Sequence, residues 1–319
     1  MKQPLISVCV ATFNHERYIS DCLMSIIAQE VPGTLEILVG DDNSGDATKE
    51  VVTAVANRFP DVIFYRCHQP QLGAAANYQS LVQQARGRYI AHCDGDDFWL
   101  PGKLSAQIAF MENHPDCPAV YSNTFTIADD GCPLGVFNNF QPARFGIADL
   151  VRHGNFLNQS SVLYRAVLRE VVLALPAPFI DYRMHLRFAR SGAVGYLNRA
   201  LVGYRVGSTS SMVMNAGDQV RQLYWDALLD VPAGSVPAID RARGMADFAR
   251  SAAFAAVRLR SLVLVRKWLP IVFRSSPVGG IRMAWLITAV IARAGVRRIL
   301  VGVCQRVGGN APYVLYRRP

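Results

Sequence analysis

Residues 89–107 read YIAHCDGDDFWLPGKLSAQ, and the prediction of the fold starts from this stretch. Its first five residues are largely apolar, as in a buried strand, and they lead directly into Asp94, Asp96 and Asp97. These carboxylates repel one another unless a positive charge lies among them. Because Trp99 follows at once, we expect a packed loop rather than a solvated turn. The stretch therefore predicts a strand that ends at a site for a cation.

The class of cation follows from the ligands. A calcium loop of the EF-hand type needs a glutamate at its twelfth position, where this sequence has Ser105, so that class is excluded. A solvated turn with no ligand is the remaining alternative. Mg²⁺ and Mn²⁺ prefer oxygen ligands and are commonly held by one or two carboxylates, with phosphate oxygens of a substrate completing the shell. The carboxylates therefore favour a divalent site for a phosphorylated ligand.

The N-terminal part of the chain alternates short apolar runs with segments of helical period. The expected strands are 5–11, 35–40, 62–66 and 89–93, and the expected helices are 16–29, 47–59 and 74–85. This alternation is typical of parallel strands joined by crossover helices. In such sheets, ligands bind beyond the carboxyl ends of the strands. Those ends carry polar and acidic residues at 12–14, 41–44 and 94–97, so we expect the site at this edge.

The rest of the chain changes character. The expected elements are a strand at 119–127, a strand turning into a helix at 161–175, a helix at 181–191 closed by Gly192, and an edge hairpin at 194–206. After residue 217 the pattern is helical, with breaks at Pro270 and Pro277. We therefore predict an α/β domain at residues 1–215, with a mostly parallel sheet flanked by helices, and a basic helical extension at 216–319.

The net charge of +9 is unevenly distributed. Residues 240–319 contain 15 Lys or Arg and two Asp, a local balance of +13, and the remainder of the chain carries −4. Such a basic appendage predicts an anionic partner: a membrane surface, a nucleic acid or phosphates. The segments 261–273 and 283–303 combine apolar runs, a tryptophan each (Trp268 and Trp285) and flanking arginines, which suits a membrane interface.

The alternative for these helices is packing against the domain with the arginines facing water. The longest uncharged run there, residues 283–292, is about half of what a membrane crossing needs. We expect a helix that is apolar over most of its circumference, with Leu286 projecting among Arg282, Arg293 and Arg297. The first apolar stretch lacks a cleavage site, and the seven scattered cysteines form no CxxC pair. The protein is therefore expected in the cytoplasm, peripheral on the inner face of the membrane.

Residues 93–107, CDGDDFWLPGKLSAQ, resemble the DxD region of family 2 glycosyltransferases, the inverting group with the GT-A fold. Three further segments, 6–29, 36–48 and 72–90, resemble the opening strand and helix, the acidic second strand end, and the third motif of that family, in order. The similarity extends over residues 4–211. It implies a GT-A domain that transfers a sugar, with inversion, from a nucleotide-diphosphate donor of the UDP or dTDP type.

The resemblance also implies roles for individual residues. Mn²⁺ or Mg²⁺ would be held by Asp96 with help from Asp94, and it would stabilise the charge of the pyrophosphate leaving group. Asp42 would accept a hydrogen bond from the nucleotide base. Asn43 stands where the family often has Gly, and Asn tolerates the left-handed backbone better than most residues. The full set assigned to the nucleotide sugar is Thr12, Asn14, Asp42, Asn43, Asn77 and Asp94.

An inverting transfer also needs a base that deprotonates the attacking hydroxyl. By register with the family the candidate is Asp181, because Leu186 and Arg187 match a Leu-Arg pair in the following helix. From its own sequence context Asp181 is a helix N-cap instead, and this alternative stays open. The family's acidic doublet is reduced here to Ile180-Asp181, and the histidine that usually follows the Tyr-Arg pair at 204–205 is absent.

The family setting implies a saccharide or lipid-linked acceptor, in cell-surface polysaccharide or O-antigen assembly, and no nucleic acid partner. The acceptor pocket is expected from loops at 130–160 and 205–220. Two rival functions are a catalytically inactive, membrane-docked member that acts as a binding subunit, and a sugar-phosphate nucleotidyltransferase. The second would need a glycine-rich loop after the first strand, and residues 11–18 (ATFNHERY) contain no glycine.

Overall fold

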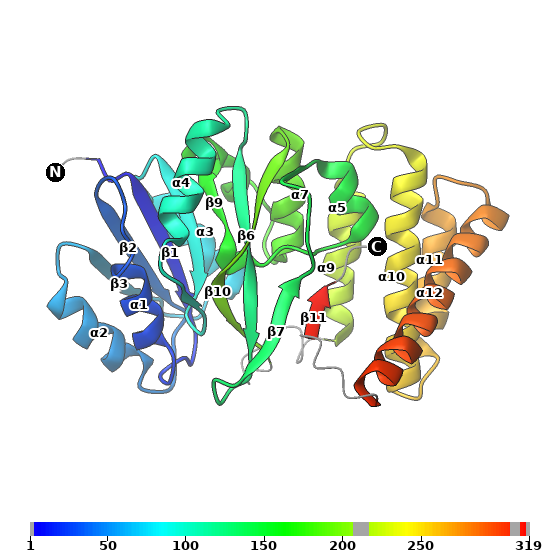
Figure 1. Ribbon diagram of the computed structural model, residues 1–319, viewed down its shortest axis with the longest axis horizontal. Coiled ribbons are helices and arrows are strands. Elements are labelled where there is room, and N and C mark those ends of the chain that lie inside the picture. The colour runs from blue at the N-terminus through cyan, green and yellow to red at the C-terminus, as the bar shows by residue number, and fades with distance from the viewer. Residues whose placement is uncertain (1–2, 207–216, 307–312, 317–319) are drawn as a thin grey trace.

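The computed structural model describes residues 3–206, 217–306 and 313–316 of the 319-residue chain. Figure 1 shows one twisted sheet with helices on both faces and a group of long helices at one end. This mixed α/β arrangement with a helical C-terminal extension is the predicted fold class. The predicted domain boundary at 215/216 lies outside the described residues and stays a prediction.

Four parallel strands form the N-terminal half of the sheet. They are β1 (Ile6–Thr12), β2 (Leu35–Asp41), β3 (Ile63–Cys67) and β4 (Tyr89–Asp94), joined by α1 (Ile19–Ile27), α2 (Thr48–Arg58) and α3 (Ala74–Gln84). They pair in the order β3-β2-β1-β4, with Thr12 opposite Asp41 and Ala11 opposite Asp94. The alternating pattern predicts all of these elements, and the register brings the acidic strand ends to one edge.

β1, β2 and β4 are buried along almost their whole length because helices cover both faces of the sheet there, whereas the edge strand β3 has exposed residues. Val8 and Val10 of β1 pack in one cluster with α1 and α2. Cys9 of β1 and Leu38 of β2 point to the other face and pack in a second cluster with α3. Burying an aliphatic side chain of this size stabilises the fold by about 1.5–3 kcal/mol. This rigid base holds the strand ends in place.

The second half of the sheet is built on β6 (Ala119–Ile127). β9 (Leu163–Arg165) lies between β4 and β6 and is antiparallel to both, so β6 runs in the same direction as β4. β7 (Pro133–Asn138) pairs with the carboxyl end of β6, and β11 (Tyr313–Tyr316) lies beside β7. The main path through the sheet has the order β11-β7-β6-β9-β4-β1-β2-β3, and three further strands lie off it.

β10 (Val194–Arg205) runs parallel to β6 and also pairs with β5 (Phe98–Trp99) and β8 (Arg144–Phe145). The hairpin predicted at 194–206 is wrong, because the segment is one strand of 12 residues. Its polar pair, Asn198 and Arg199, looks like a turn in the sequence. In the structure it lies where the register with β6 shifts, so the chain bulges instead of reversing.

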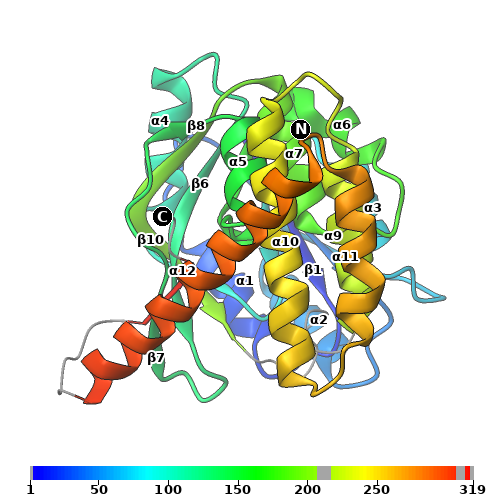
Figure 2. The same ribbon diagram turned by 90° about the vertical axis from the view of Figure 1, so that its right-hand side faces the viewer.

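The remaining helices cover the second half of the sheet and form the extension. They are α4 (Lys103–Asn113), α5 (Ile147–His153), α6 (Arg169–Leu173), α7 (Asp181–Ser191), α9 (Gly217–Leu229), α10 (Ala238–Arg258), α11 (Val263–Ser275) and α12 (Gly280–Arg306). α10 packs on α5, and α11 and α12 pack on α10 (Figure 2). α7 ends before Gly192, as the sequence predicts.

The extension packs on the domain through an apolar cluster that continues from one to the other. The rings of Trp225, Phe248 and Trp268 lie with centroids 4.9–6.2 Å apart. Trp268 is 1% exposed and Leu286 is 6% exposed. The predictions that Trp268 suits a membrane interface and that Leu286 projects among arginines are therefore wrong. Trp268 of α11 and Leu286 of α12 thus face the core of the protein.

Two further sequence predictions concern the helices and the cysteines. α11 continues through Pro270, so the break predicted there is wrong, whereas Pro277 lies between α11 and α12 as predicted. The Pro270 ring is exposed, and the helix loses only one backbone N–H bond. Within the described ranges, no helix has the length and hydropathy needed to cross a bilayer. The cysteines with described side chains are free thiols.

Candidate active site

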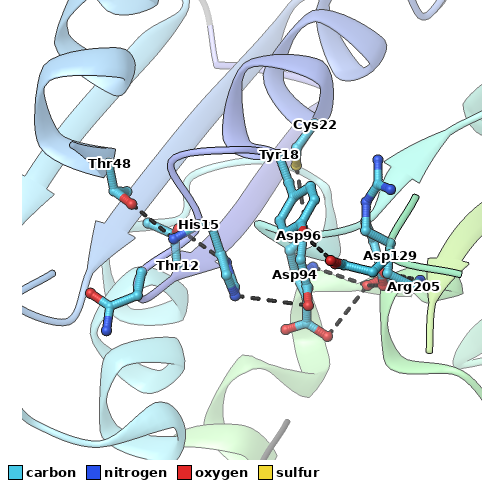
Figure 3. Close-up of polar contacts among 12 residues, drawn as sticks. Thr12, His15, Tyr18, Cys22, Thr48, Asp94, Asp96, Asp129 and Arg205 are labelled. Carbon is cyan, nitrogen blue, oxygen red and sulfur yellow. Dashed lines mark hydrogen bonds and ion pairs between the residues drawn. The ribbon is translucent and has the colours of Figure 1, made fainter. Parts of the chain in front are cut away.

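The carboxyl ends of β1 and β4 bring two polar loops together at one edge of the sheet (Figure 3). The turn at 94–97 is tied to β1 because the N–H of Gly95 donates to the Ala11 carbonyl at 2.8 Å. A Cβ at Gly95 would come within 2.8 Å of the Thr12 and His15 side chains. Glycine therefore allows the acidic turn to approach β1 this closely.

Asp96 is the carboxylate of this turn that faces His15 (Figure 3). Its Oδ2 lies 3.8 Å from Nε2 of His15, whose Nδ1 lies 3.2 Å from Oγ1 of Thr12. The side chain of Asp96 is 14% exposed, so a ligand can reach it from the edge. Thr12 is buried beneath this pair. The structure thus brings together two residues that the sequence assigned to the site, and adds His15.

Asp94 is held from two sides. Its Oδ1 lies 2.9 Å from Nε2 of His92, and its backbone N–H donates to Oγ of Ser160 at 2.9 Å. The surrounding protein alone would raise the pKa of Asp94, but His92, and to a smaller extent His15 and Ser160, lower it below its usual value. Asp94 is therefore ionised at neutral pH, as a cation ligand must be.

Asp97 is the buried member of the turn. Its Oδ2 accepts a hydrogen bond from Oγ of Ser160 at 2.5 Å, and its Oδ1 accepts the N–H of Arg205 at 3.1 Å. Burial, with the carboxylates of Asp96 and Asp94, raises the pKa of Asp97 well above its usual value. Asp97 therefore anchors the turn to β10 and to the short helix η1 (Gln159–Ser161).

Asp42 and Asn77 hold the segments around the expected nucleotide pocket. The carboxylate of Asp42 accepts the N–H groups of Leu72 and Gly73 at 2.7 and 2.9 Å. Each oxygen keeps a lone pair for a further donor such as a nucleotide base. Asn77 is 1% exposed and donates from Nδ2 to the Gly40 carbonyl at 2.8 Å. In this position it joins α3 to β2, and its contact with the donor stays a prediction.

Asn43 and Asn14 shape the loop after β2. Asn43 has a φ of 66°, the left-handed conformation that asparagine tolerates. Asn14 has a φ of 55°, and its Oδ1 accepts the N–H of Gly45 at 2.8 Å. Its backbone N–H donates to Oγ of Ser44 at 2.9 Å. Asn14 therefore connects the first and second strand ends, and the donor contacts of both asparagines stay predictions.

Asp181 is the first residue of α7, and the N-cap position belongs to Ile180. Its Oδ1 accepts the N–H of Tyr182 at 2.7 Å and Nδ2 of Asn155 at 3.0 Å. Burial raises the pKa of Asp181 to about 6, although both hydrogen bonds lower it. Asp181 is thus ionised at neutral pH and more basic than an ordinary aspartate, which suits a general base.

Sequence reasoning did not assign His92, Ser160, Asn155 or His185 to the site. His92 is 3% exposed, but it contacts Asp94. The sequence could have indicated the contact between His92 and Asp94, because residues two apart on a strand share one face. Asn155 lies in the irregular segment 154–158 and Ser160 in η1, a single short turn, so no periodic pattern could have identified them.

The donor set of this edge fits a hard divalent cation. Asp94 and Asp96 supply carboxylate oxygens, which Mg²⁺ and Mn²⁺ prefer. Within the described part of the chain, no three Asp, Glu, His or Cys side chains form a metal cluster. The cation at Asp94 and Asp96 stays a prediction. Of the loops expected to bind the acceptor, residues 207–216 lie outside the description.

Solved structures with a similar fold include S. aureus TarS and a mannosyltransferase. S. aureus TarS 1–349 in complex with UDP aligns with a TM-score of 0.59 at 19% identity, over 79% of this chain and 73% of TarS 1–349. The mannosyltransferase PcManGT from Pyrobaculum calidifontis, in complex with GDP-Man and Mn²⁺, aligns with a TM-score of 0.55 at 17% identity, over 91% and 87%. The fold is that of the GT-A glycosyltransferases.

Sequence comparisons give the family. Residues 7–132 match the model of glycosyl transferase family 2. The putative glycosyltransferase EpsE of Bacillus subtilis is 32% identical over 215 residues, 63% of this chain and 73% of EpsE. The Escherichia coli UDP-Glc:alpha-D-GlcNAc-diphosphoundecaprenol beta-1,3-glucosyltransferase WfaP is 28% identical over 223 residues, 68% and 84%. The chain belongs to glycosyltransferase family 2.

The matches differ in how much of each relative they cover. An uncharacterised protein of Mycobacterium tuberculosis is 30% identical over 201 residues, which are 63% of this chain. The chain spans 58% of the length of that relative.

Proposed function

We propose that the protein is an inverting glycosyltransferase that moves a sugar from a nucleotide-diphosphate donor to a saccharide or lipid-linked acceptor. The observation that supports this most directly is the position of η1. Ser160 of η1 bonds to Asp97 and to the backbone of Asp94. The neighbouring Gln159 contacts His185, which contacts Asn155, the residue that donates a hydrogen bond to Asp181. The candidate base and the cation-binding turn thus share one support.

The residues would act as follows. The acceptor hydroxyl gives its proton to Asp181 as its oxygen attacks the anomeric carbon, and the nucleoside diphosphate leaves from the opposite face of the sugar. Mn²⁺ or Mg²⁺, held by Asp96 and Asp94, would supply charge stabilisation to the departing pyrophosphate. Asp42 and Thr12 would bind the nucleotide. Because the pKa of Asp181 is about 6, the base is available at neutral pH.

Relatives and structural neighbours support these partners. TarS has been solved with UDP and with UDP-GlcNAc, and PcManGT with GDP-Man and Mn²⁺. WfaP and WfgD of E. coli carry names that give UDP-Glc as donor and a diphosphoundecaprenol-linked GlcNAc as acceptor. A UDP-type donor, a divalent cation and a lipid-linked acceptor in cell-surface polysaccharide assembly are therefore our proposal for this chain.

A second candidate function is that of a catalytically inactive binding subunit. The absent histidine after Arg205 and the single acid at 180–181 favour it. Both functions predict donor binding, and only the enzyme releases the nucleoside diphosphate. Membership of family 2 leaves no support for a sugar-phosphate nucleotidyltransferase.

We further propose that the extension docks on the anionic inner face of the cytoplasmic membrane. The α10–α11 connection, taken here with the last residues of α10 and the first of α11, carries apolar side chains that are 60–77% exposed: Val257, Leu259, Leu262 and Val263. Exposed arginines flank them at 258, 260 and 266. This connection lies at the same end of the molecule as the carboxyl ends of β1 and β4 (Figures 1 and 2). A membrane there would bring a lipid-linked acceptor toward the site.

Two linked measurements test the proposed activity. Nucleotide sugars are first screened for an increase in melting temperature in the presence of Mn²⁺, and the stabilising donor is then assayed for release of its nucleoside diphosphate with a lipid-linked acceptor. We expect one donor class to do both. Binding without release would support the inactive binding subunit. If no sugar nucleotide bound with Mn²⁺ or Mg²⁺, the proposal would be wrong.

A further inference from the structure

A chain of hydrogen bonds leads from the candidate base into the interior of the protein. Nδ2 of Asn155 donates to Oδ1 of Asp181 at 3.0 Å, and Oδ1 of Asn155 lies 3.1 Å from Nδ1 of His185. Nε2 of His185 lies 2.9 Å from Oε1 of Gln159. Asn155 is 9% exposed and His185 is fully buried. The chain therefore connects α7 to η1 through side chains that water hardly reaches.

The chemistry of the chain fixes where its protons lie. An ionised carboxylate only accepts hydrogen bonds, so Asn155 must turn its NH₂ to Asp181 and its carbonyl to His185. Nδ1 of His185 must then carry the ring proton. Burial lowers the pKa of His185 to about 3, so the ring is neutral and Nε2 is an acceptor. Gln159 must donate to it, which needs a half-turn of its terminal amide.

This arrangement leaves one oxygen of the base free to react. The N–H of Tyr182 and Nδ2 of Asn155 both bond to Oδ1 of Asp181. No residue within the described ranges donates a hydrogen bond to Oδ2. Oδ2 is thus the atom that can take a proton from an acceptor. The other titratable groups around this chain are Asp94 and His92 of β4 and Tyr121 of β6, whose ring meets His185 edge-on.

We propose that Asn155 and His185 are positioning residues for the base. His185 fixes the rotation of the Asn155 amide, and Asn155 in turn holds Oδ1 of Asp181 so that Oδ2 points at the acceptor hydroxyl. This role rests on the proposed function, in which Asp181 is the base. An apolar side chain could fill the space of His185, but it could not orient the amide.

The pH profile of turnover tests the role of Asn155. The acid limb of kcat/KM reports the ionisation of the base in the free enzyme. Asn155→Ala removes a hydrogen bond to the charged form of Asp181, so we expect the limb to move to higher pH by roughly one unit. We expect kcat to fall about 10-fold or more, with the KM for the donor unchanged. A residue that only stabilised the fold would move neither quantity.

A pair of substitutions tests His185. Asn at this position puts a side-chain NH₂ close to where Nδ1–H lies, so His185→Asn should keep the acid limb near that of the wild type. His185→Leu fills the space without a hydrogen-bond donor, and the acid limb of its kcat/KM profile should shift to higher pH as in Asn155→Ala. Asn123→Ala is the matched control, since Asn123 is a buried amide that donates to the Asn138 carbonyl at 2.9 Å and bonds only to Asn138 and the N–H of Thr124 among the described residues. It should lose stability without moving the limb.

The outcomes separate this inference from the proposed function. Wild-type acid limbs and kcat in Asn155→Ala and His185→Leu would overturn the positioning role while leaving the transferase intact. If the protein transferred no sugar, the ¹³C titration of the Asp181 carboxyl group, assigned by its absence in Asp181→Asn, still tests the contact. A higher titration midpoint of the Asp181 carboxyl group in Asn155→Ala supports the proposed hydrogen-bond chain, and an unchanged midpoint overturns it. If His185→Leu does not fold, Asn155→Ala and His185→Asn carry the comparison.

Discussion

Asp94, Asp96 and Asp97 lie within four residues, yet their surroundings give them different chemistry. Asp97 is enclosed and bonded to Ser160 and Arg205, so its pKa is raised and it anchors the turn. Asp94 is paired with His92, which lowers its pKa and leaves it ionised. Asp96 is accessible beside His15. The sequence spacing identified the cluster, but only the tertiary contacts separate a structural acid from the proposed cation ligands.

Asp96→Asn tests the cation ligand. We expect it to abolish Mn²⁺-dependent nucleotide binding and transfer. The fold should stay intact and be neutral to about 1 kcal/mol more stable without ligand, because the substitution removes one of the charges that repel Asp97. Nucleotide titration with and without Mn²⁺, together with urea unfolding, measures both effects. Normal turnover of this variant with added metal would rule out Asp96 as a ligand.

The buried base should also affect stability, with a defined sign. The pKa of Asp181 is raised from 3.8 to about 6 in the folded protein. The neutral form therefore favours folding, and this stability is lost as pH rises from below 4 through about 6. Asp181→Asn cannot ionise, so its free energy of unfolding should exceed that of the wild type by about 2 kcal/mol more at pH 7.5 than at pH 4. Urea unfolding at both pH values measures the difference, and equal differences would contradict a buried carboxylate.

At the scale of elements, the sequence predicts the parts whose pattern is local. The strands and helices of residues 5–94 follow from alternation of apolar runs and helical periods, because β1, β2 and β4 are covered on both faces. The hairpin prediction for β10 is wrong because the polar pair at 198–199 has the sequence of a turn, and only the pairing of β10 with β6 shows that the strand continues. The interface prediction for Trp268 is wrong because an apolar helix stripe with a tryptophan has the same sequence pattern whether it contacts lipid or protein.

The residues of the candidate site also differ in how far the sequence alone predicts them. Asp94 and Asp96 follow from the sequence because they lie next to each other at a strand end. Asp181 is far away in the chain and could be assigned only by its register with the family. Asn155 and His185 gave no signal, since their role depends on α7 and an irregular segment meeting in three dimensions.

The contact between the acidic turn and β1 gives a prediction for an element. Gly95→Ala would put a Cβ within 2.8 Å of Thr12 and His15. The turn must then move away from β1, so we expect loss of metal-dependent donor binding and a stability cost of about 1–3 kcal/mol. Gly146→Ala is the control, because its φ is −106° and nothing lies within 4 Å of the added Cβ. Wild-type donor affinity in Gly95→Ala would contradict the packing described for this turn.

At the scale of the whole molecule, the helical extension has two exposed apolar surfaces at its opposite ends. One is the α10–α11 connection, with Leu262 and Val263 exposed by 62% and 66%. The other is the start of α12, where Ile281 and Trp285 are exposed by 91% and 66%. Arginines accompany both, and each basic residue near an anionic surface contributes about 1 kcal/mol. The first surface lies at the same end as the active site (Figure 1).

Vesicle binding distinguishes the two surfaces. The protein should co-sediment with anionic but not zwitterionic vesicles, and ~0.5 M salt should weaken the binding because exposed charges are screened. Leu262→Glu with Val263→Glu should reduce it strongly, and the matched pair Ile281→Glu with Trp285→Glu should leave most of it. The opposite ranking would place the docking surface at the wrong end for the site. If the wild type ignored anionic vesicles at low salt, membrane docking would be wrong altogether.

The split between donor binding and turnover in Asp181→Asn is the most direct test of the proposed enzyme. The substitution removes the base but keeps the size of the side chain and both hydrogen bonds to its oxygen, so the donor and Mn²⁺ should bind as in the wild type. Turnover at saturating donor and acceptor should fall by ~10²-fold or more. Weakened donor binding with unchanged turnover at saturation would contradict the role of Asp181 as the base, and would make Asp181 a structural or donor-binding residue.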